Sequence, residues 1–256
     1  MVTLEQIQKI VRKKDLFTGG SGGGKTHTAL FDMLGLISAG MAKSAVIIDC
    51  EAGTIDEMEA LMSGESEFGN AELFQQLLEP VEYHAVSTWS EYKKLALSGA
   101  DAVLIDTLNH KHVLARHHIK DEIQKSGEIK VGSGMVKLTD PDSWTLDWEH
   151  YNQVYELETR FMEQLMHCGS HIIATLDPNL GKSNKQKGEQ NSVDGYFSLI
   201  IDTSIEGKDY RGLILKNRGK RANVNVKNPY YSVVKRYGDS ELLKVIEKTI
   251  GDGKDE

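Results

Sequence analysis

The chain has 256 residues, 39% of them hydrophobic and 27% charged, a balance typical of folded globular proteins rather than disordered ones. It lacks an apolar run of about 20 residues, the apolar core of a secretory signal and enough cysteines for a disulfide framework, which together favour a reduced, cytoplasmic protein without membrane spans. Its net charge of −8 argues against a non-specific binder of polyanions.

Short apolar runs alternate with longer amphipathic stretches along the chain. A short helix is expected first, at 4–11. Runs of aliphatic residues without polar alternation predict buried parallel strands at 44–50, 102–106 and 171–176. A shorter run at 81–86 is expected to add another strand, and 15–18 is expected to be the end of a first strand. Apolar residues that recur on one face predict helices at 26–39 and 148–167. Short consecutive strands follow at 199–205, 212–216, 222–226 and 231–234, and then a final helix at 239–248.

This order of elements predicts an α/β fold with a mostly parallel central sheet, flanked by helices and extended by antiparallel strands at its C-terminal side. Segments 124–143 and 177–193 lack periodicity and are rich in Gly, Ser, Lys and Asn, so we expect long loops there. No linker or repeat divides the chain. We expect one domain over 1–256, with an N-terminal helix within 1–14 and a C-terminal helix and tail at 239–256.

The charge is unevenly distributed over these elements. Residues 181–236 contain twelve Lys and Arg but only five Asp and Glu, a local net charge of +7. A solvent-exposed basic face is the usual explanation of such a cluster, so the charge alone is a weak indication of a surface that binds phosphate groups.

The segment Gly19–Thr26 reads GGSGGGKT and fits the phosphate-binding pattern G-x-x-x-x-G-K-[ST], between a predicted strand and a predicted helix. Glycines let backbone N–H groups point at phosphate oxygens, and the helix N-terminus adds its positive dipole end. The lysine would reach the β- and γ-phosphates, and the threonine hydroxyl would ligate Mg²⁺. The residues expected to hold ATP are Gly19, Gly20, Ser21, Gly22, Gly23, Gly24, Lys25, Thr26 and His27.

Two acidic strand ends are candidates for the remaining chemistry. Asp106 closes the strand AVLID and is expected to hold Mg²⁺ together with Thr26, unless it only caps the next helix. Glu51 follows the strand VIIDC, which we expect beside the first strand, so its carboxylate would accept a proton from attacking water. Asp49 is the competing candidate for this base, and a helix N-cap is the structural alternative for Glu51.

Three segments give the sequence a resemblance to RecA-like P-loop ATPases: GGSGGGKT (19–26), VIIDCE (46–51) and AVLIDT (102–107). It is also similar to a phage and archaeal-virus group associated with single-strand annealing, through the tryptophan of Asp147–Glu149, the strand HIIATLDPN and the Val-Asp pair at 193–194. This resemblance covers about residues 15–225. It implies that Glu51 is the catalytic glutamate.

The resemblance further implies a homo-oligomer, ring or filament, in which a cation reaches the neighbour's γ-phosphate. Lys216 and Arg218 resemble the K-x-R pair that some RecA relatives use in this way. The alternative is that they are simply solvent-exposed basic residues at the end of a strand. The loops 124–143 and 177–193 occupy the places of DNA-binding loops, with Lys130, Lys137, Lys182, Lys185 and Lys187 as phosphate contacts. Neither loop has an aromatic platform for bases.

We therefore expect a Mg-ATPase that acts with single-stranded DNA in recombination or replication of a phage or mobile element, with a single-strand-binding or annealing protein as a further partner. A nucleotide-dependent switch or assembly protein with slow hydrolysis is the alternative. A small-molecule kinase is disfavoured, because Arg116 is the only arginine between Thr107 and Arg160, where kinases of this size carry an Arg-rich lid.

Overall fold

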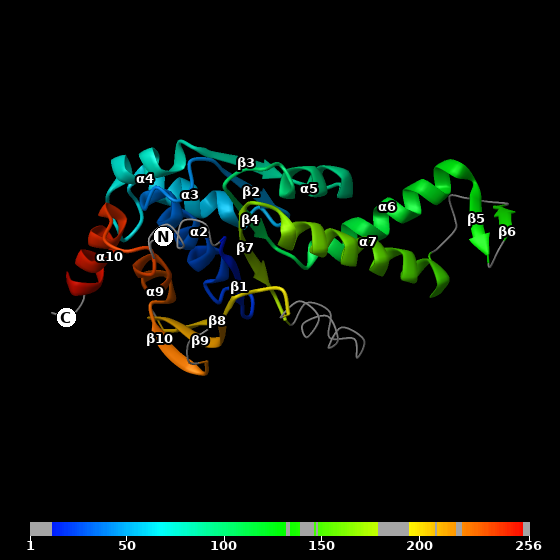
Figure 1. Ribbon diagram of the computed structural model, residues 1–256. Coiled ribbons are helices and arrows are strands. Elements are labelled where there is room, and N and C mark those ends of the chain that lie inside the picture. Colours follow the sequence, from blue (N-terminus) through cyan, green and yellow to red (C-terminus); the bar gives the residue numbers. More distant parts are fainter. Residues whose placement is uncertain are drawn as a thin grey trace, which may run out of the picture.

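The computed structural model describes residues 12–131, 134–138, 146, 148–178, 195–207, 209–218 and 222–252. An eight-stranded sheet with the order β10-β9-β8-β1-β7-β4-β2-β3 forms its centre (Figure 1). The expected helix at 4–11 and the loop residues from 179 to 193 lie outside the described residues.

The parallel part of the sheet confirms the predicted fold class. The strands that run parallel to their neighbours here are β1 (Lys14–Thr18), β2 (Ala45–Asp49), β3 (Val81–Ala85), β4 (Ala102–Asp106), β7 (His171–Leu176) and β8 (Leu199–Glu206). Every residue of β2, β4 and β7 is buried, as their aliphatic runs predict. The antiparallel extension consists of β9 (Asp209–Asn217) and β10 (Val224–Lys227).

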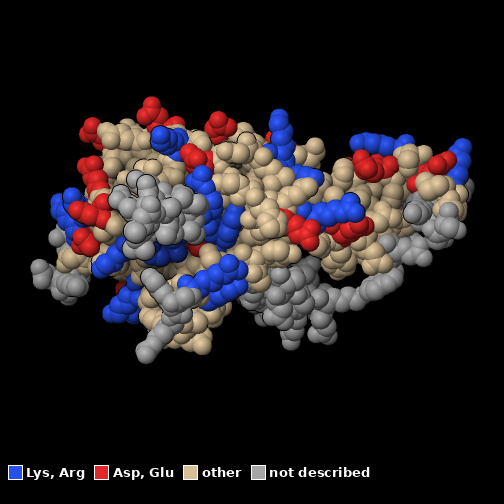
Figure 2. Space-filling model, in the orientation of Figure 1, with Lys and Arg blue, Asp and Glu red and all other residues tan. Residues whose placement is uncertain are grey.

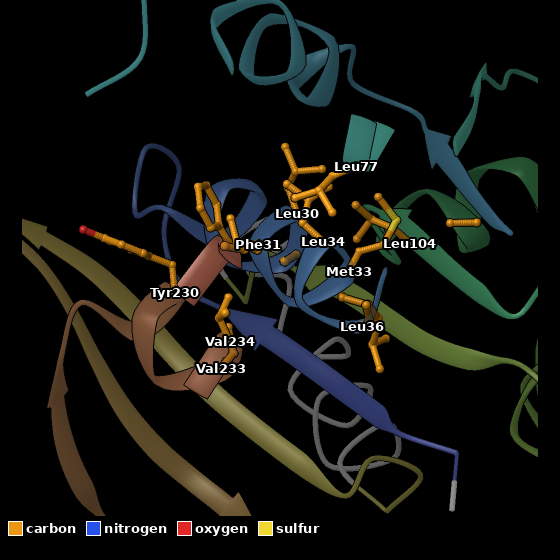
Figure 3. Close-up of a cluster of buried hydrophobic side chains, with 14 of the residues drawn as sticks. Leu30, Phe31, Met33, Leu34, Leu36, Leu77, Leu104, Tyr230, Val233 and Val234 are labelled. Atoms are coloured by element: carbon orange, nitrogen blue, oxygen red, sulfur yellow. The ribbon is translucent and has the colours of Figure 1, made fainter. Parts of the chain in front are cut away.

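Helices cover both faces of the sheet, and each face has its own hydrophobic core. One core lies beneath α2 (Lys25–Ser38), α3 (Gly53–Ser63), α4 (Ala71–Leu78), α9 (Pro229–Lys235) and α10 (Glu241–Asp252). The other lies beneath α5 (Trp89–Ala96), α6 (His110–Ser126) and α7 (Trp148–His167). Helix α2 is buried over most of its length, between the sheet and helices α4 and α9 (Figure 3). The phosphate-loop helix is therefore anchored on several sides.

Two predictions about local structure are wrong. Residues 231–234 belong to helix α9 and not to a strand, because Pro229 starts a helix there and Val233 and Val234 pack with Tyr230 against α2 (Figure 3). A run of β-branched residues this short does not distinguish a strand from a buried helix.

The segment 124–143 is also more ordered than predicted. Its start belongs to α6, which continues to Ser126, and strands β5 (Glu128–Val131) and β6 (Gly134–Lys137) follow as an antiparallel hairpin. Helices α6 and α7 run side by side away from the sheet, and the hairpin lies at their far end (Figure 1). Its side chains Met135 and Val136 are exposed.

The uneven charge of the sequence is visible on the surface. Asp and Glu gather along the upper edge over α4 and β3, whereas Lys and Arg are more frequent lower down, over α9 and β10 (Figure 2). Both cysteines are free thiols. None of the helices in the described ranges combines the length and the apolar character of a membrane span.

Candidate nucleotide site

The loop between β1 and α2 has a backbone that only glycine allows. Gly19, Gly22 and Gly24 have φ angles of 142°, 71° and 79°. A Cβ on Gly19 would lie 2.2 Å from the carbonyl oxygen of Thr203, and one on Gly23 would lie 2.9 Å from the same oxygen. Strand β8 therefore packs directly against this loop. A side chain at Gly19 or Gly23 would displace the loop from the strand.

The loop leads into a helix end suited to an anion. The N-cap residue Gly24 provides no side-chain cap, and the first turn of α2 carries no acidic residue, so its N–H groups remain available to phosphate oxygens. The Nζ of Lys25 donates to the carbonyl oxygen of Gly20 at 2.8 Å, which also accepts the N–H of Gly23 at 3.0 Å. The lysine is therefore folded over the loop that the pattern predicts to hold phosphates.

The structure brings the predicted magnesium ligands together. The Thr26 hydroxyl donates to Oδ2 of Asp106 at 2.8 Å, although the two residues are 80 positions apart. The Thr54 hydroxyl donates to the same oxygen at 3.0 Å, and the Thr175 hydroxyl donates to Oδ1. Asp106 itself is buried. A hydroxyl and a carboxylate oxygen are hard ligands of the kind that Mg²⁺ prefers, so these residues fit the ion.

The two candidates for the base have different surroundings. Asp49 is buried, and its carboxylate accepts the N–H groups of Glu51, Ala52 and Thr54 at 2.7–2.9 Å, so it clamps the turn into α3. The Glu51 side chain is 45% exposed at the carboxyl edge of the sheet. Of the two carboxylates, only that of Glu51 has room to meet a water molecule.

The predicted place of β2 beside β1 is wrong. Strands β7 and β4 lie between them, because the chain crosses over after α5 and α7 instead of adding neighbours in sequence order. Glu51 still reaches the same edge as Asp106, since Asp49 and Asp106 are paired in register and the N–H of Cys50 donates to the carbonyl oxygen of Asp106 at 2.7 Å.

The carboxylates make this edge strongly negative. Burial, followed by the charges of Asp49, Asp106 and Glu51, raises the pKa of Cys50 to about 12. Cys50 is therefore a neutral thiol and no nucleophile. An edge with these charges needs cations, which Lys25 and a divalent metal would supply. Within the described ranges, no cluster of three His, Cys, Asp or Glu residues forms a metal site of its own.

The side chain of His27 packs among aromatic residues of β9 and α9. The ring is buried, stacks on Tyr210 with centroids 4.8 Å apart, and lies 5.0 Å from Tyr230. Its Nδ1 is 3.1 Å from Oε2 of Glu57. Burial alone would raise the pKa of Glu57, but the hydrogen bond and charge of His27 outweigh it and lower the pKa. Only the backbone N–H of His27 is left for a phosphate.

Lys216 and Arg218 lie beside the start of β8, whereas the chain's own phosphate loop contacts Thr203, a few residues further along the same strand. Lys216 pairs with Ile200 at the start of β8, and the N–H of Arg218 donates to the carbonyl oxygen of Ser198 at 3.0 Å. The phosphate loop follows Thr18, which pairs with the middle of β8. Of the loop lysines, Lys182, Lys185 and Lys187 fall outside the described residues, and Lys137 is exposed on β6.

Several contacts of the site were not predicted from the sequence. They come from Thr54, Thr203, Tyr210 and Asn109, and no local pattern marks any of them. The Nδ2 of Asn109 donates to the carbonyl oxygen of Asp177 at 3.0 Å, and the N–H of Asp177 donates to Oδ1 of Asn109 at 2.8 Å. The ends of β4 and β7 are thereby tied together next to Asp106.

Comparison with known proteins gives a fold likeness only. No protein-family model and no curated protein sequence matches the chain. Among solved structures, the RadB recombinase is similar at 12% identity and a TM-score of 0.48, over 85% of this chain and 87% of that one. A KaiC-like protein from the archaeon Pyrococcus horikoshii is similar at 14% identity and the same TM-score, also over 85% and 87%. Likeness at this level assigns no activity.

Proposed function

We propose that the chain is a RecA-like ATPase that binds Mg-ATP and hydrolyses it as a ring or filament, acting with single-stranded DNA in recombination or replication of a phage or mobile element. It would work in the cytoplasm, in the host cell if the source is viral. The observation that carries the proposal is the 2.8 Å contact between Thr26 and Asp106 beneath a loop that only glycines can form.

Different residues have different roles in the transfer of the γ-phosphoryl group to water. The N–H groups at the start of α2 and the Nζ of Lys25 bind the phosphates, and Thr26 and Asp106 hold the metal. When bound, Mg²⁺ supplies positive charge against the phosphate oxygens. Glu51 takes a proton from the attacking water as its oxygen bonds to the γ-phosphorus, and the bond to the β–γ bridging oxygen breaks to release ADP.

Lys216 and Arg218 lie beside the start of β8 and not at Thr203, where β8 meets the phosphate loop, and this position leads us to assign them a role across a subunit boundary. Charge on the transferring phosphoryl group needs a cation, and an arginine supplied by a neighbour is worth about 10³–10⁵ in rate. We propose that one subunit's Arg218, or its Lys216, approaches the γ-phosphate bound by the next subunit. An isolated chain would then hydrolyse ATP slowly.

A nucleotide-dependent switch is the second candidate, and the hydrogen bonds that join the end of β4 to β7 favour it. Asp106 is joined through the Thr175 hydroxyl to β7, and Asn109 exchanges two hydrogen bonds with Asp177, the first residue of the expected loop 177–193. A change at the metal ligand would thereby be transmitted to the end of β7. In this alternative the chain binds nucleotide tightly, turns it over slowly and controls a protein partner.

ATP turnover with and without single-stranded DNA decides between these functions. We expect stimulation by DNA in the wild type, loss of turnover in Lys25→Ala, and normal turnover in Lys43→Ala, whose lysine is exposed just before β2. Tight ATP binding with slow turnover that DNA does not change would favour the switch. Full turnover in Lys25→Ala would overturn the nucleotide site itself.

A further inference from the structure

The side chain of His110, the first residue of α6, lies against that of Glu51. Its Nδ1 is 3.7 Å from Oε1 of Glu51, and among the described residues this buried ring nitrogen makes no hydrogen bond. A buried polar nitrogen without a hydrogen-bond partner costs free energy. A hydrogen bond from the Nδ1 of His110 to an acceptor within reach is therefore favoured. Because the Glu51 side chain is 45% exposed, a small rotation brings its carboxylate to hydrogen-bond distance.

Hydrogen bonds hold the backbone in place at both Glu51 and His110. The N–H of Glu51 donates to Asp49 at 2.8 Å, and the neighbouring N–H of Cys50 donates to the carbonyl oxygen of Asp106. On the other side, the N–H of His110 donates to the carbonyl oxygen of Thr107 at 3.3 Å. The two side chains therefore start from adjacent, registered strand ends, and their approach follows from the sheet itself.

We propose that His110 is a positioning residue for Glu51: its Nδ1–H donates to one carboxylate oxygen and leaves the other directed at the attacking water. The proposal rests on the proposed function, because Glu51 is the expected base. A carboxylate on a half-exposed side chain has several rotamers, and a fixed donor selects the productive one. His110 would exchange no proton with the substrate and touch no phosphate.

Steady-state kinetics separates this role from a structural one. We expect His110→Ala to lower kcat about tenfold with KM for ATP changed less than about twofold, because orientation of the base affects only the chemical step. His110→Asn should recover most of kcat, since its amide N–H replaces the Nδ1 donor. His117→Asn is the matched control, because His117 is exposed on the same helix, and it should behave as wild type.

Double mutants test whether His110 acts through Glu51. In the Glu51→Gln background, His110→Ala should lower kcat no further, because the carboxylate that it orients is gone. Full additivity of the two losses, or a rise in KM with unchanged kcat, would overturn the proposal and place His110 on the nucleotide instead.

A spectroscopic measurement tests the contact without turnover. In protein with ¹⁵N-labelled histidine, the neutral ring of His110 should carry its proton on Nδ1, and Glu51→Gln should remove this preference. The same tautomer in both proteins would overturn the proposal. If the wild type lacks ATP turnover, the proposed function fails on its own, while the tautomer still decides whether His110 donates to Glu51.

Discussion

A buried ion cluster joins the C-terminal part of the chain to the phosphate-loop helix. Arg236, just after α9, donates to Asp15 of β1 at 2.8 Å and to Asp32 of α2 at 2.7 Å. The hydroxyl of Tyr237 donates to Asp32 at 2.6 Å. Both carboxylates are buried, with residue exposures of 1% and 0%. Replacing Arg236 by Met keeps much of the packing volume and leaves both carboxylates without their cation.

The expected loss follows from burial. Removing one partner of a buried ion pair costs about 3–5 kcal/mol in the free energy of unfolding, because the remaining charge has neither water nor a partner. Two carboxylates depend on Arg236, so we expect the upper part of this range at pH 8. The variant that also carries Asp15→Asn and Asp32→Asn should regain much of the loss, since it leaves no unpaired charge.

Urea unfolding followed by circular dichroism measures these differences. At an m-value of about 3 kcal/mol per M, the loss in Arg236→Met lowers the urea midpoint by about 1–1.7 M. Lys235→Met, on the exposed side of the same helix, should leave the midpoint unchanged. A loss below about 1 kcal/mol in Arg236→Met would refute the reasoning, because the cluster would then be solvated or redundant.

Three further predictions concern the ion cluster, the phosphate loop and the subunit boundary. Burial raises the pKa of Asp32 to about 7, so the folded state holds its proton between about pH 4 and pH 7 and stability falls as pH rises through that window; urea unfolding of Asp32→Asn should lack this fall. Gly23→Ala should weaken nucleotide affinity about tenfold or more by calorimetry, because its Cβ meets two backbone oxygens, whereas Gly169→Ala, with open space, should not. Mixing Glu51→Gln subunits with Arg218→Ala subunits should give more ATP turnover than either alone, and no recovery would remove support for the trans-acting arginine.

Features encoded by short stretches of sequence were predictable. The strands 102–106 and 171–176 are found at their predicted bounds, because a run of aliphatic residues buried on both faces has few other solutions. The contact of Thr26 with Asp106 was predictable as well, since the phosphate loop and the acidic strand end meet at one edge of a parallel sheet. What these patterns identify is the glycine loop and the contact of Thr26 with Asp106 beside it, where we propose that the phosphates and the metal bind.

Features that depend on distant partners were not predictable. The segment 231–234 is helical because Val233 and Val234 pack on α2, about 200 residues earlier in the sequence, and local β-propensity cannot report that contact. The separation of β1 from β2 has the same origin, since strand order is decided by crossovers. The packing of the His27 ring in an aromatic cluster with Tyr210 and Tyr230 depends on distant residues in the same way.

The structure also changes what the basic segment 181–236 means. Arg236 is paired with the buried carboxylates of Asp15 and Asp32. Its charge is therefore neutralised within the protein and does not contribute to a surface for DNA. Arg218 lies beside the start of β8, whereas the phosphate loop contacts the middle of this strand at Thr203. If Arg218 serves a neighbour's ATP, the contact joins two different surfaces of identical chains. Such a heterologous contact repeats from subunit to subunit, and it closes into a ring or continues as a filament according to the rotation between neighbours. The proposed trans-acting arginine and the proposed ring or filament are therefore one hypothesis, and the subunit-mixing experiment tests both.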